Sequence, residues 1–203
     1  MNEKERMLAG LMYDATDKEL EKERFAAEEL YFKFNNLPPS KNEEKLEILK
    51  QLFGKIGKNS YIRSTLYCDY GYNIEIGDNF YANHNLTILD CAKVKFGDNV
   101  FIAPNCGFYC AGHPIDAQER NTLVEYAKPI TVGNNVWIGA DVCVMPGVTI
   151  GDNTVIGAGS VITRDIPANV VAAGAPCRVI REITEADKSD YFNVLETLYD
   201  GGK

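Results

Sequence analysis

The chain has 203 residues, 45% of them hydrophobic and 25% charged, which indicates one globular protein with a sizeable core and excludes a disordered or fibrous chain. No run approaches the roughly 18 apolar residues that a membrane helix needs, and the residues from Met1 to Arg6 lack the apolar core of a signal peptide, so a cytoplasmic location is expected. A formal net charge of −8 argues against nucleic acids and anionic membranes as partners, because both attract clustered Lys and Arg.

Residues 1–57 have the composition of a helical segment. Helices are expected over residues 3–12 and 17–36, and Thr16 with Glu19 has the spacing of a capping box at the start of the second. Two consecutive prolines at positions 38 and 39 end that helix.

A third helix is expected after these prolines. Ser40 and Glu43 have capping-box spacing, and the chain leaves the helix at Gly54. Its apolar face comprises Leu46, Ile48, Leu49, Leu52 and Phe53. The helical segment either covers the open end of the structure that follows, where an unpaired edge would invite association, or also forms one wall of a substrate pocket. The two roles are compatible.

A six-residue period organises residues 58–183. Aliphatic side chains return at every sixth position, and four of them precede a glycine: Val132, Ile138, Val144, Ile150, Ile156 and Ile162. Small or β-branched residues follow four positions later: Val136, Val142, Val148, Thr154, Ser160 and Ile166. A period of six fits neither an α-helix nor a flat strand, but it suits a chain that turns a corner after each short strand. Three hexapeptides would then close one coil, which pairs with the next as parallel strands do.

The same period starts near residue 60 and is interrupted once. Phe96, Ile102 and Phe108 are in phase with it, whereas Ile76 is shifted by two residues. The interruption, an extruded loop at about 111–129, is charged and has no clear periodicity. Long loops in a compact repeat are usually functional or disordered.

Residues 184–203 are expected to form a short polar helix at the carboxyl end. Thr184 and Asp187 offer a weak start signal for it. A modest apolar stripe follows at Tyr191, Leu195 and Leu198.

The six cysteines have no Cys-x-x-Cys pair and no zinc-site spacing, so we interpret them as reduced, small core residues. They lie at positions 68, 91, 106, 110, 143 and 177. Cys106 and Cys110 stand close to the interrupting loop, which leaves a thiol nucleophile as a minor alternative, but nothing beside them in the sequence supplies a base.

Only two histidines are present, His84 and His113. His113 opens the interrupting loop, where an imidazole facing a cleft would suit general-base work at neutral pH; the alternative is an exposed loop residue. His84 is interpreted as structural, or as a residue that supports a neighbouring group of the site. A three-histidine zinc site within one chain is impossible, and no metal requirement is expected.

Six segments in order resemble the maltose and galactoside O-acetyltransferase family over nearly the whole chain. They are Asp69-Tyr-Gly-Tyr-Asn73, Asn79-Phe-Tyr-Ala-Asn83, Ile102-Ala-Pro-Asn105, Gly112-His-Pro114, Gly133-Asn-Asn-Val-Trp-Ile-Gly139 and Pro146-Gly-Val-Thr-Ile-Gly-Asp152. Hexapeptides alone indicate only the wider acyltransferase superfamily, whereas Tyr-Ala-Asn and Gly-His-Pro in this order favour the sugar-acetylating branch. The resemblance implies a mainly β fold: a left-handed parallel β-helix of hexapeptide repeats with an α-helical amino-terminal segment and a short carboxyl-terminal helix. Its handedness rests on the resemblance alone.

The resemblance also implies direct transfer of acetyl from acetyl-CoA to a sugar hydroxyl, with the 6-hydroxyl of maltose, glucose or a galactoside expected, without an acyl-enzyme. His113 matches the family's catalytic base. Asn83 matches the residue that positions the reacting group and stabilises the tetrahedral oxyanion. The alternative for Asn83 is a corner residue that tolerates unusual backbone angles.

Positions that line the family's CoA tunnel match Ala140, Ala158, Thr163, Arg164, Arg178 and Arg181. Small side chains would admit the pantetheine arm and the arginines would meet phosphates, although ordinary surface charge would also explain the arginines. Trp137, the only tryptophan, either packs against the pantetheine or serves core or subunit packing.

Asp69, Tyr81 and Cys91 fall at positions that contact sugar in the family. Asp69 can accept bonds from sugar hydroxyls, and Tyr81 can stack or donate. Cys91 departs from the galactoside type, which carries an acid at that position. A second acid of that type, near position 15, falls on Ala15 here. The neighbouring Asp14 is therefore a fourth candidate for contact with the sugar. The pattern is nearer the maltose type, and the physiological acceptor stays open.

Family members assemble as homotrimers with active sites between subunits, so the resemblance implies self-association as well as CoA and a sugar acceptor as partners. Two other functions are considered. One is a related acyltransferase for a non-sugar acceptor such as an antibiotic. The other is a non-catalytic solenoid scaffold, against which His113, Asn83 and the carboxyl-terminal arginines argue together.

Overall fold

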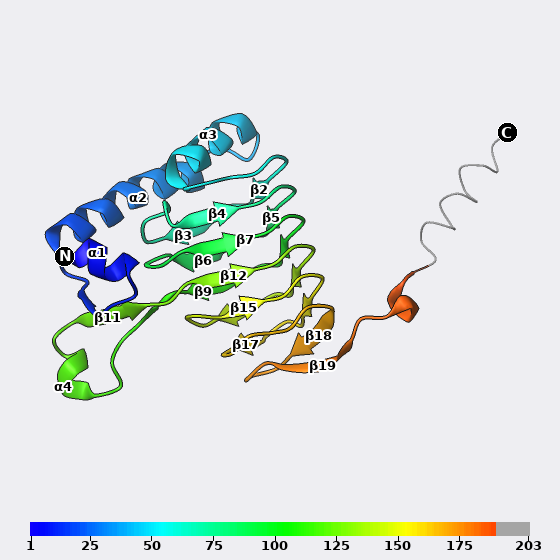
Figure 1. The fold of residues 1–203 in the computed structure, drawn as a ribbon. Helices are drawn as coiled ribbons and strands as arrows, with labels where there is room; N and C mark the ends of the chain where they lie inside the picture. The colour runs from blue at the N-terminus through cyan, green and yellow to red at the C-terminus, as the bar shows by residue number, and fades with distance from the viewer. Residues whose placement is uncertain (190–203) are drawn as a thin grey trace.

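A computed structural model describes residues 1–189, and these residues form a parallel β-helix with helices at one end (Figure 1). Successive coils run from the helical end, at β2 and β4, towards β18 and β19 at the other. The expected apolar stripe at Tyr191, Leu195 and Leu198 lies outside the described residues.

Three faces of the β-helix are each a sheet of short strands. The first face holds β4 (Ile74–Ile76), β7 (Val94–Phe96), β12 (Ile130–Val132) and β15 (Thr149–Ile150). The second holds β2 (Tyr61–Ile62), β5 (Tyr81–Ala82), β8 (Phe101–Ile102), β13 (Trp137–Ile138), β16 (Val155–Ile156), β18 (Val170–Ala173) and β19 (Arg178–Glu182). The third holds β3 (Leu66–Cys68), β6 (Leu86–Leu89), β9 (Gly107–Tyr109), β14 (Cys143–Val144) and β17 (Val161–Ile162). Within these three faces all pairings are parallel except that of β18 with β19.

Both sets of residues that recur every six positions are buried. The aliphatic set points inward from the strands, and even the polar members of the second set, Thr154 and Ser160, are fully buried. Their hydroxyls donate to the carbonyls of Pro167 and Gly157 respectively, so no polar atom there is left without a partner. The period of six therefore predicts the core correctly.

Close approach between coils explains the repeated glycines. A Cβ on Gly139 would lie 2.6 Å from the backbone nitrogen of Ala158, and one on Gly133 would lie 2.2 Å from a carboxylate oxygen of Asp152. One corner instead carries a column of asparagines with left-handed backbone angles, with φ between 52° and 62°: Asn59, Asn79, Asn99, Asn135, Asn153 and Asn169. Their side-chain amides bond from coil to coil, as Asn99 does to Asn135 at 3.0 Å.

The two-residue phase shift at Ile76 marks longer coils. Ile76 lies in register with Phe96, 20 residues on, whereas Val132 lies in register with Ile150, 18 residues on. The extra residues all fall in the corner that leads from the third face to the first, between β3 and β4 and again between β6 and β7. In the next coil the same corner carries the whole interruption.

That interruption is an ordered hairpin. β10 (Ala111–Gly112) pairs antiparallel with β11 (Val124–Ala127), and a short helix α4 (Ala117–Arg120) lies at its tip (Figure 1). On its other side β11 pairs with β1 (Tyr13–Asp14) from the amino-terminal segment. Three stacked corners and one amino-terminal strand therefore meet on the same edge of the β-helix.

The helices differ in detail from the sequence predictions. α1 spans Glu3–Leu8 and stops short of residue 12, because the chain there turns into β1. α2 (Lys18–Asn36) is capped by Asp17, which accepts from the N–H groups of Glu19 and Leu20; the Thr16 capping box is wrong, because Asp14 takes both the N–H and the hydroxyl of Thr16.

The capping box predicted for the third helix is also wrong. α3 (Asn42–Leu52) begins after Lys41, which makes no side-chain cap bond, because a turn closed from the N–H of Lys41 to the carbonyl of Pro38 moves the start past Ser40. At the open edge of β3, Asn35 of α2 donates to the carbonyl of Leu66 and accepts from its N–H, both at 2.8 Å. The helices thus cover the exposed first coil.

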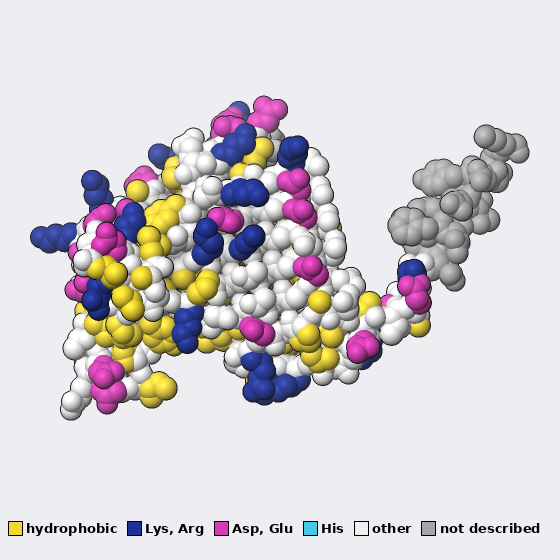
Figure 2. All heavy atoms as spheres, viewed as in Figure 1, with side chains coloured by type: hydrophobic (Ala, Val, Ile, Leu, Met, Phe, Trp, Pro, Cys, Tyr) yellow, Lys and Arg dark blue, Asp and Glu magenta, His cyan; other side chains and the backbone are white. Residues whose placement is uncertain are grey.

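At the carboxyl end the described residues form a 3₁₀ turn, Glu185–Asp187, that begins at Thr184, whose N–H donates to Asp187 at 2.8 Å; the rest of the expected helix lies outside the described residues. On the sheet that contains β4 and β7, acidic and basic side chains lie together, as in the 2.6 Å pair of Lys93 and Glu75, so the net negative charge is not gathered on that face (Figure 2). No helix among residues 1–189 is both long and apolar enough to span a bilayer.

Candidate active site

A cavity of about 500 Å³ lies where the lengthened corners, the hairpin and the amino-terminal segment meet. Its size is typical of small-molecule sites. The lining residues are Ala15, Arg24, Asp69, Tyr70, Leu89, Cys91, Tyr109, Ala111, Gly112, His113 and Glu125. Three of the predicted site residues, Asp69, Cys91 and His113, are therefore brought together within one chain.

His113 follows β10 and is held by the opposite strand of the hairpin. Its Nδ1 lies 3.1 Å from the backbone carbonyl oxygen of Val124, and because a carbonyl only accepts, Nδ1 carries the proton in this contact. That leaves the lone pair of the neutral ring on Nε2, which lies 3.7 Å from Oε1 of Glu125. The side chain is 48% exposed. In the neutral ring this arrangement places the Nε2 lone pair at the cavity, where it can take a proton.

Glu125 was missed by the sequence analysis. Its Oε2 accepts a 2.6 Å hydrogen bond from the hydroxyl of Tyr13, which is fully buried. Burial is the main reason that the pKa of Tyr13 is raised far above its usual range, so the phenol stays a donor. The pairing of Tyr13 with Glu125 across β1 and β11 is a long-range contact, and the only sequence signal for Glu125 is its place in the interrupting loop.

The half-buried Asp69 and the buried Cys91 form an acid and thiol pair on the cavity wall. The thiol donates to Oδ2 of Asp69 at 3.2 Å. Burial raises the pKa of both groups, and the neighbouring Asp69 raises that of Cys91 further, so the thiol remains protonated. The pair can offer a carboxylate oxygen to a ligand hydroxyl, with the thiol holding the carboxylate in place.

Asp90 lies behind this wall and fixes both lengthened corners. It is fully buried, and its carboxylate accepts the backbone N–H groups of Asp69, Tyr70 and Asn73 at 3.1, 2.9 and 3.3 Å. Burial raises the pKa of Asp90 to about 7. Its role is to hold the corner that carries Asp69 rather than to face the cavity, since it is absent from the lining.

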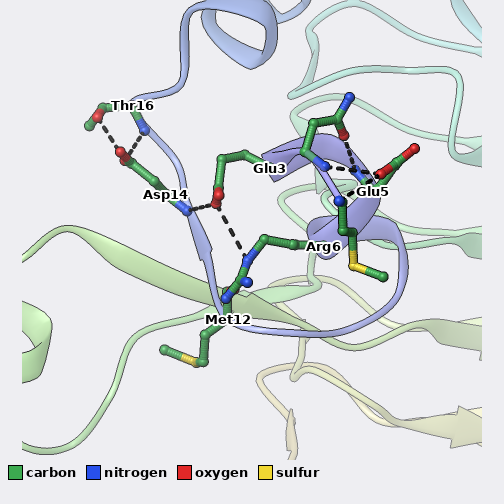
Figure 3. A network of polar contacts seen from close by, with 8 residues as sticks. Glu3, Glu5, Arg6, Met12, Asp14 and Thr16 are labelled. Carbon is green, nitrogen blue, oxygen red and sulfur yellow. Dashed lines mark hydrogen bonds and ion pairs between the residues drawn. The ribbon is translucent and has the colours of Figure 1, made fainter.

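Arg24 of α2 brings the helical segment into the site. Its guanidinium donates to the hydroxyl of Tyr70 and to the carbonyl of Ala15, both at 2.8 Å. The amino-terminal helices thus serve as a cavity wall as well as a cap. Asp14, the predicted acceptor contact, is exposed and outside the lining; its carboxylate is bonded to Thr16 (Figure 3). Ala15 lines the cavity in its place.

Tyr81 and Asn83 lie in a different hollow of about 530 Å³ on the second face. That hollow is mainly apolar and is lined by Tyr81, Asn83, Phe101, Ile102, Ala103 and Trp137. A single chain therefore does not bring Asn83 to His113. The left-handed corner conformation belongs to Asn85, with φ of 60°, and not to Asn83.

Trp137 is 57% exposed, so it is not a core residue. The other positions matched to the CoA tunnel lie at two corners and on the last strand. Ala140 and Ala158 follow the second-face strands β13 and β16, Thr163 and Arg164 follow β17 of the third face, and Arg178 and Arg181 lie on β19; all are exposed apart from the half-buried Ala140. Arg181 is held by a two-pronged pair with Asp187 at 2.8 and 2.6 Å, which lowers the pKa of Asp187 to about 2.

His84 is exposed, and its ring contacts the carbonyl of Ser64 on the preceding coil, in keeping with a structural role. The thiols give no support to a cysteine nucleophile. Burial raises the pKa of Cys106 to about 11 and that of Cys110 to about 12, so both stay protonated near neutral pH. Within residues 1–189, no three His, Cys, Asp or Glu side chains are grouped so as to hold a metal ion.

Known proteins resemble this chain over most of its length. A family profile described as the maltose acetyltransferase hexapeptide capping motif matches residues 6–57, and one for the bacterial transferase hexapeptide matches residues 129–164. The galactoside O-acetyltransferase of Escherichia coli is 50% identical over 93% of this chain and 93% of its own. A putative acetyltransferase of Saccharomyces cerevisiae is 54% identical over 91% and 95% respectively.

Two solved structures show the same architecture. A maltose O-acetyltransferase from Clostridium difficile superposes with a TM-score of 0.90 at 53% identity, covering 91% of this chain and 99% of that one. A galactoside acetyltransferase in complex with coenzyme A gives 0.91 at 49% identity, covering 95% and 96%. The left-handed parallel β-helix and the resemblance are both confirmed. The chain belongs to the maltose and galactoside O-acetyltransferase family of hexapeptide-repeat enzymes.

Proposed function

We propose that this protein transfers an acetyl group from acetyl-CoA to a sugar hydroxyl, with His113 as the general base. The observation that carries the proposal is the orientation of His113: Nδ1 is engaged by the Val124 carbonyl, and Nε2 is left free in a cavity with Glu125 beside it. An imidazole fixed in one tautomer is suited to proton transfer at neutral pH.

The step balances without an acyl-enzyme. Nε2 of His113 takes the hydroxyl proton as the sugar oxygen attacks the thioester carbonyl, and the carbon–sulfur bond then breaks. The same nitrogen returns the proton to the departing thiolate. While the ring is charged, the Val124 carbonyl and the Glu125 carboxylate both stabilise it.

The polar groups on the cavity wall suit a sugar. Asp69 has an oxygen that is not engaged by Cys91 and can accept a ligand hydroxyl, and the Arg24 guanidinium lies on the same wall. A primary hydroxyl, such as the 6-hydroxyl, projects furthest from a sugar ring and is the easiest to bring to His113.

A complete site needs a second copy of the chain. Asn83 and Trp137 lie on the second face, away from the His113 cavity of their own chain, and that face exposes Phe101 and Trp137 at 50% and 57%. We propose a homotrimer in which this face covers the His113 cavity of a neighbour. Asn83 then donates to the developing oxyanion. The positions after β13, β16 and β17 and the arginines of β19 then contact CoA.

Acceptor-dependent thiol release from acetyl-CoA tests the proposed function. The panel holds maltose, glucose, a galactoside and an aminoglycoside antibiotic. Release that requires a sugar supports the proposal and ranks the acceptors. Release only with the antibiotic would show that the acceptor is not a sugar. A chain that does not bind CoA would instead be a non-catalytic scaffold.

A further inference from the structure

Tyr13 connects the amino-terminal segment to the His113 cavity without lining it. The residue lies on β1, is fully buried, and is absent from the cavity lining. Its hydroxyl donates to Oε2 of Glu125 at 2.6 Å, a separation typical of an O–H donor to a charged carboxylate. The other oxygen of that carboxylate, Oε1, lies 3.7 Å from Nε2 of His113. One carboxylate therefore bridges a buried phenol and the proposed base.

The hydroxyl of Tyr13 determines where this carboxylate lies. Among residues 1–189 it is the only hydrogen-bond donor to the Glu125 side chain. The two residues are directly opposite each other in the pairing of β1 with β11, so the backbone register sets the distance between them. Without this bond the Glu125 side chain, which is 20% exposed, would be free to rotate towards solvent and away from the imidazole.

Helix α1 in turn holds β1 in position. The backbone N–H of Asp14 donates to Oε2 of Glu3 at 2.6 Å, and Nε of Arg6 donates to the carbonyl of Met12 at 2.8 Å (Figure 3). These two bonds fasten the residues on either side of Tyr13 to α1. The phenol is therefore presented to the hairpin on a strand that both α1 and β11 hold in place.

A buried tyrosine by itself would indicate only core packing. Tyr72 provides the comparison, because its hydroxyl also donates to a glutamate of the amino-terminal segment, Oε2 of Glu23, at 2.8 Å. That glutamate is paired with Lys4, and neither Tyr72 nor Glu23 lines the His113 cavity. What distinguishes Tyr13 is that its partner carboxylate has its second oxygen beside the base.

We propose that Tyr13 is a positioning residue of the acetyl transfer, whose hydroxyl holds Glu125 so that Oε1 stays beside Nε2 of His113 when the ring becomes charged. This inference rests on the proposed function and gives the amino-terminal segment a part in the chemistry, beyond its roles as cap and cavity wall. Because Tyr13 does not line the cavity, its hydroxyl acts on the charged ring of the transition state and not on acceptor binding. Its loss therefore lowers kcat and leaves KM unchanged.

The test measures kcat and KM for the best sugar acceptor in the wild type, Tyr13→Phe, Glu125→Gln and the double variant, each below its thermal midpoint so that every enzyme assayed is folded. Tyr13→Phe keeps the buried ring and removes only the hydroxyl. Its kcat falls about threefold to fivefold, and no further than that of Glu125→Gln, with KM unchanged. The double variant has the kcat of Glu125→Gln alone, because the position of the side chain no longer matters once its charge is gone.

Tyr72→Phe is the matched control: it removes the same kind of hydrogen bond to the same segment and leaves kcat and KM at wild-type values. A kcat for Tyr13→Phe equal to that of Tyr72→Phe, or the same fold loss from Tyr13→Phe with and without Glu125→Gln, overturns the positioning role while leaving sugar acetylation standing. A wild type that acetylates no sugar would overturn the proposed function and this inference with it.

Discussion

The tautomer and the surroundings of the His113 ring are set by groups that are distant in sequence. Val124 fixes its tautomer, and Glu125 lies beside its free nitrogen and is itself held by the buried Tyr13. The chain links these residues only through the pairing of β1, β10 and β11. A candidate base can therefore be picked from its rarity and its loop, but the groups that orient it cannot be identified without the hairpin register.

Glu125→Gln tests this arrangement at a single residue. The substitution removes the negative charge beside the imidazolium while keeping a similar shape, so kcat should fall about three- to tenfold with little change in KM, the scale of a partly exposed charge pair. Steady-state kinetics with the best acceptor provides the measurement. Glu119→Gln, at the exposed tip of the same hairpin, should match the wild type. Equal kcat values for the two variants would remove Glu125 from the mechanism.

At the scale of the element, the six-residue period predicts coils, strand phase and core because each hexapeptide buries the same kind of side chain in the same place. It says less about the corners. The shift at Ile76 is visible in the sequence, but only the register shows that the extra residues of two coils fall in one corner and place Asp69 and Cys91 side by side. Helix starts are mispredicted for a local reason: competing turns take up Thr16 and bypass Ser40.

The corner asparagines make a prediction about stability. Asn99 has φ of 55° and bonds to Asn79 and Asn135 on the neighbouring coils. Asn99→Ala should lower the free energy of unfolding by about 1–3 kcal/mol, through backbone strain and lost hydrogen bonds. Asn99→Gly should recover the strain part, because glycine adopts this conformation freely.

Chemical denaturation with urea measures these changes. Asn36→Ala is the control, since its amide bonds only within α2, to the carbonyl of Phe32, and this variant should stay within about 0.5 kcal/mol of the wild type. If Asn99→Ala is no less stable than Asn36→Ala, the asparagine column does not stabilise the coils.

For the whole molecule, the central feature is that proposed partners in catalysis occupy different faces of one chain. The His113 cavity and the hollow that contains Asn83 are lined by separate sets of residues. Sequence resemblance implies a trimer, but the six-residue period describes only the inside of one chain and cannot show which faces meet.

Mixed assemblies test whether the site is shared. His113→Ala and Asn83→Ala chains, each nearly inactive alone, are unfolded together, refolded at equal amounts and assayed. If each site takes His113 from one chain and Asn83 from its neighbour, about one site in four receives both native residues, so about a quarter of wild-type activity should return. Sites contained within single chains would give no recovery, and a monomer by light scattering would contradict the model independently.

The most direct test of the account is the rate of thiol release from acetyl-CoA, with a saturating sugar acceptor, by wild type and His113→Ala. The side chain is half-exposed, so the variant should fold, and its thermal midpoint should stay close to that of the wild type. The account predicts that the rate of the variant falls by a factor of about 100 or more, the usual contribution of a positioned general base. A correctly folded His113→Ala enzyme that keeps its rate within a few-fold of wild type would contradict it.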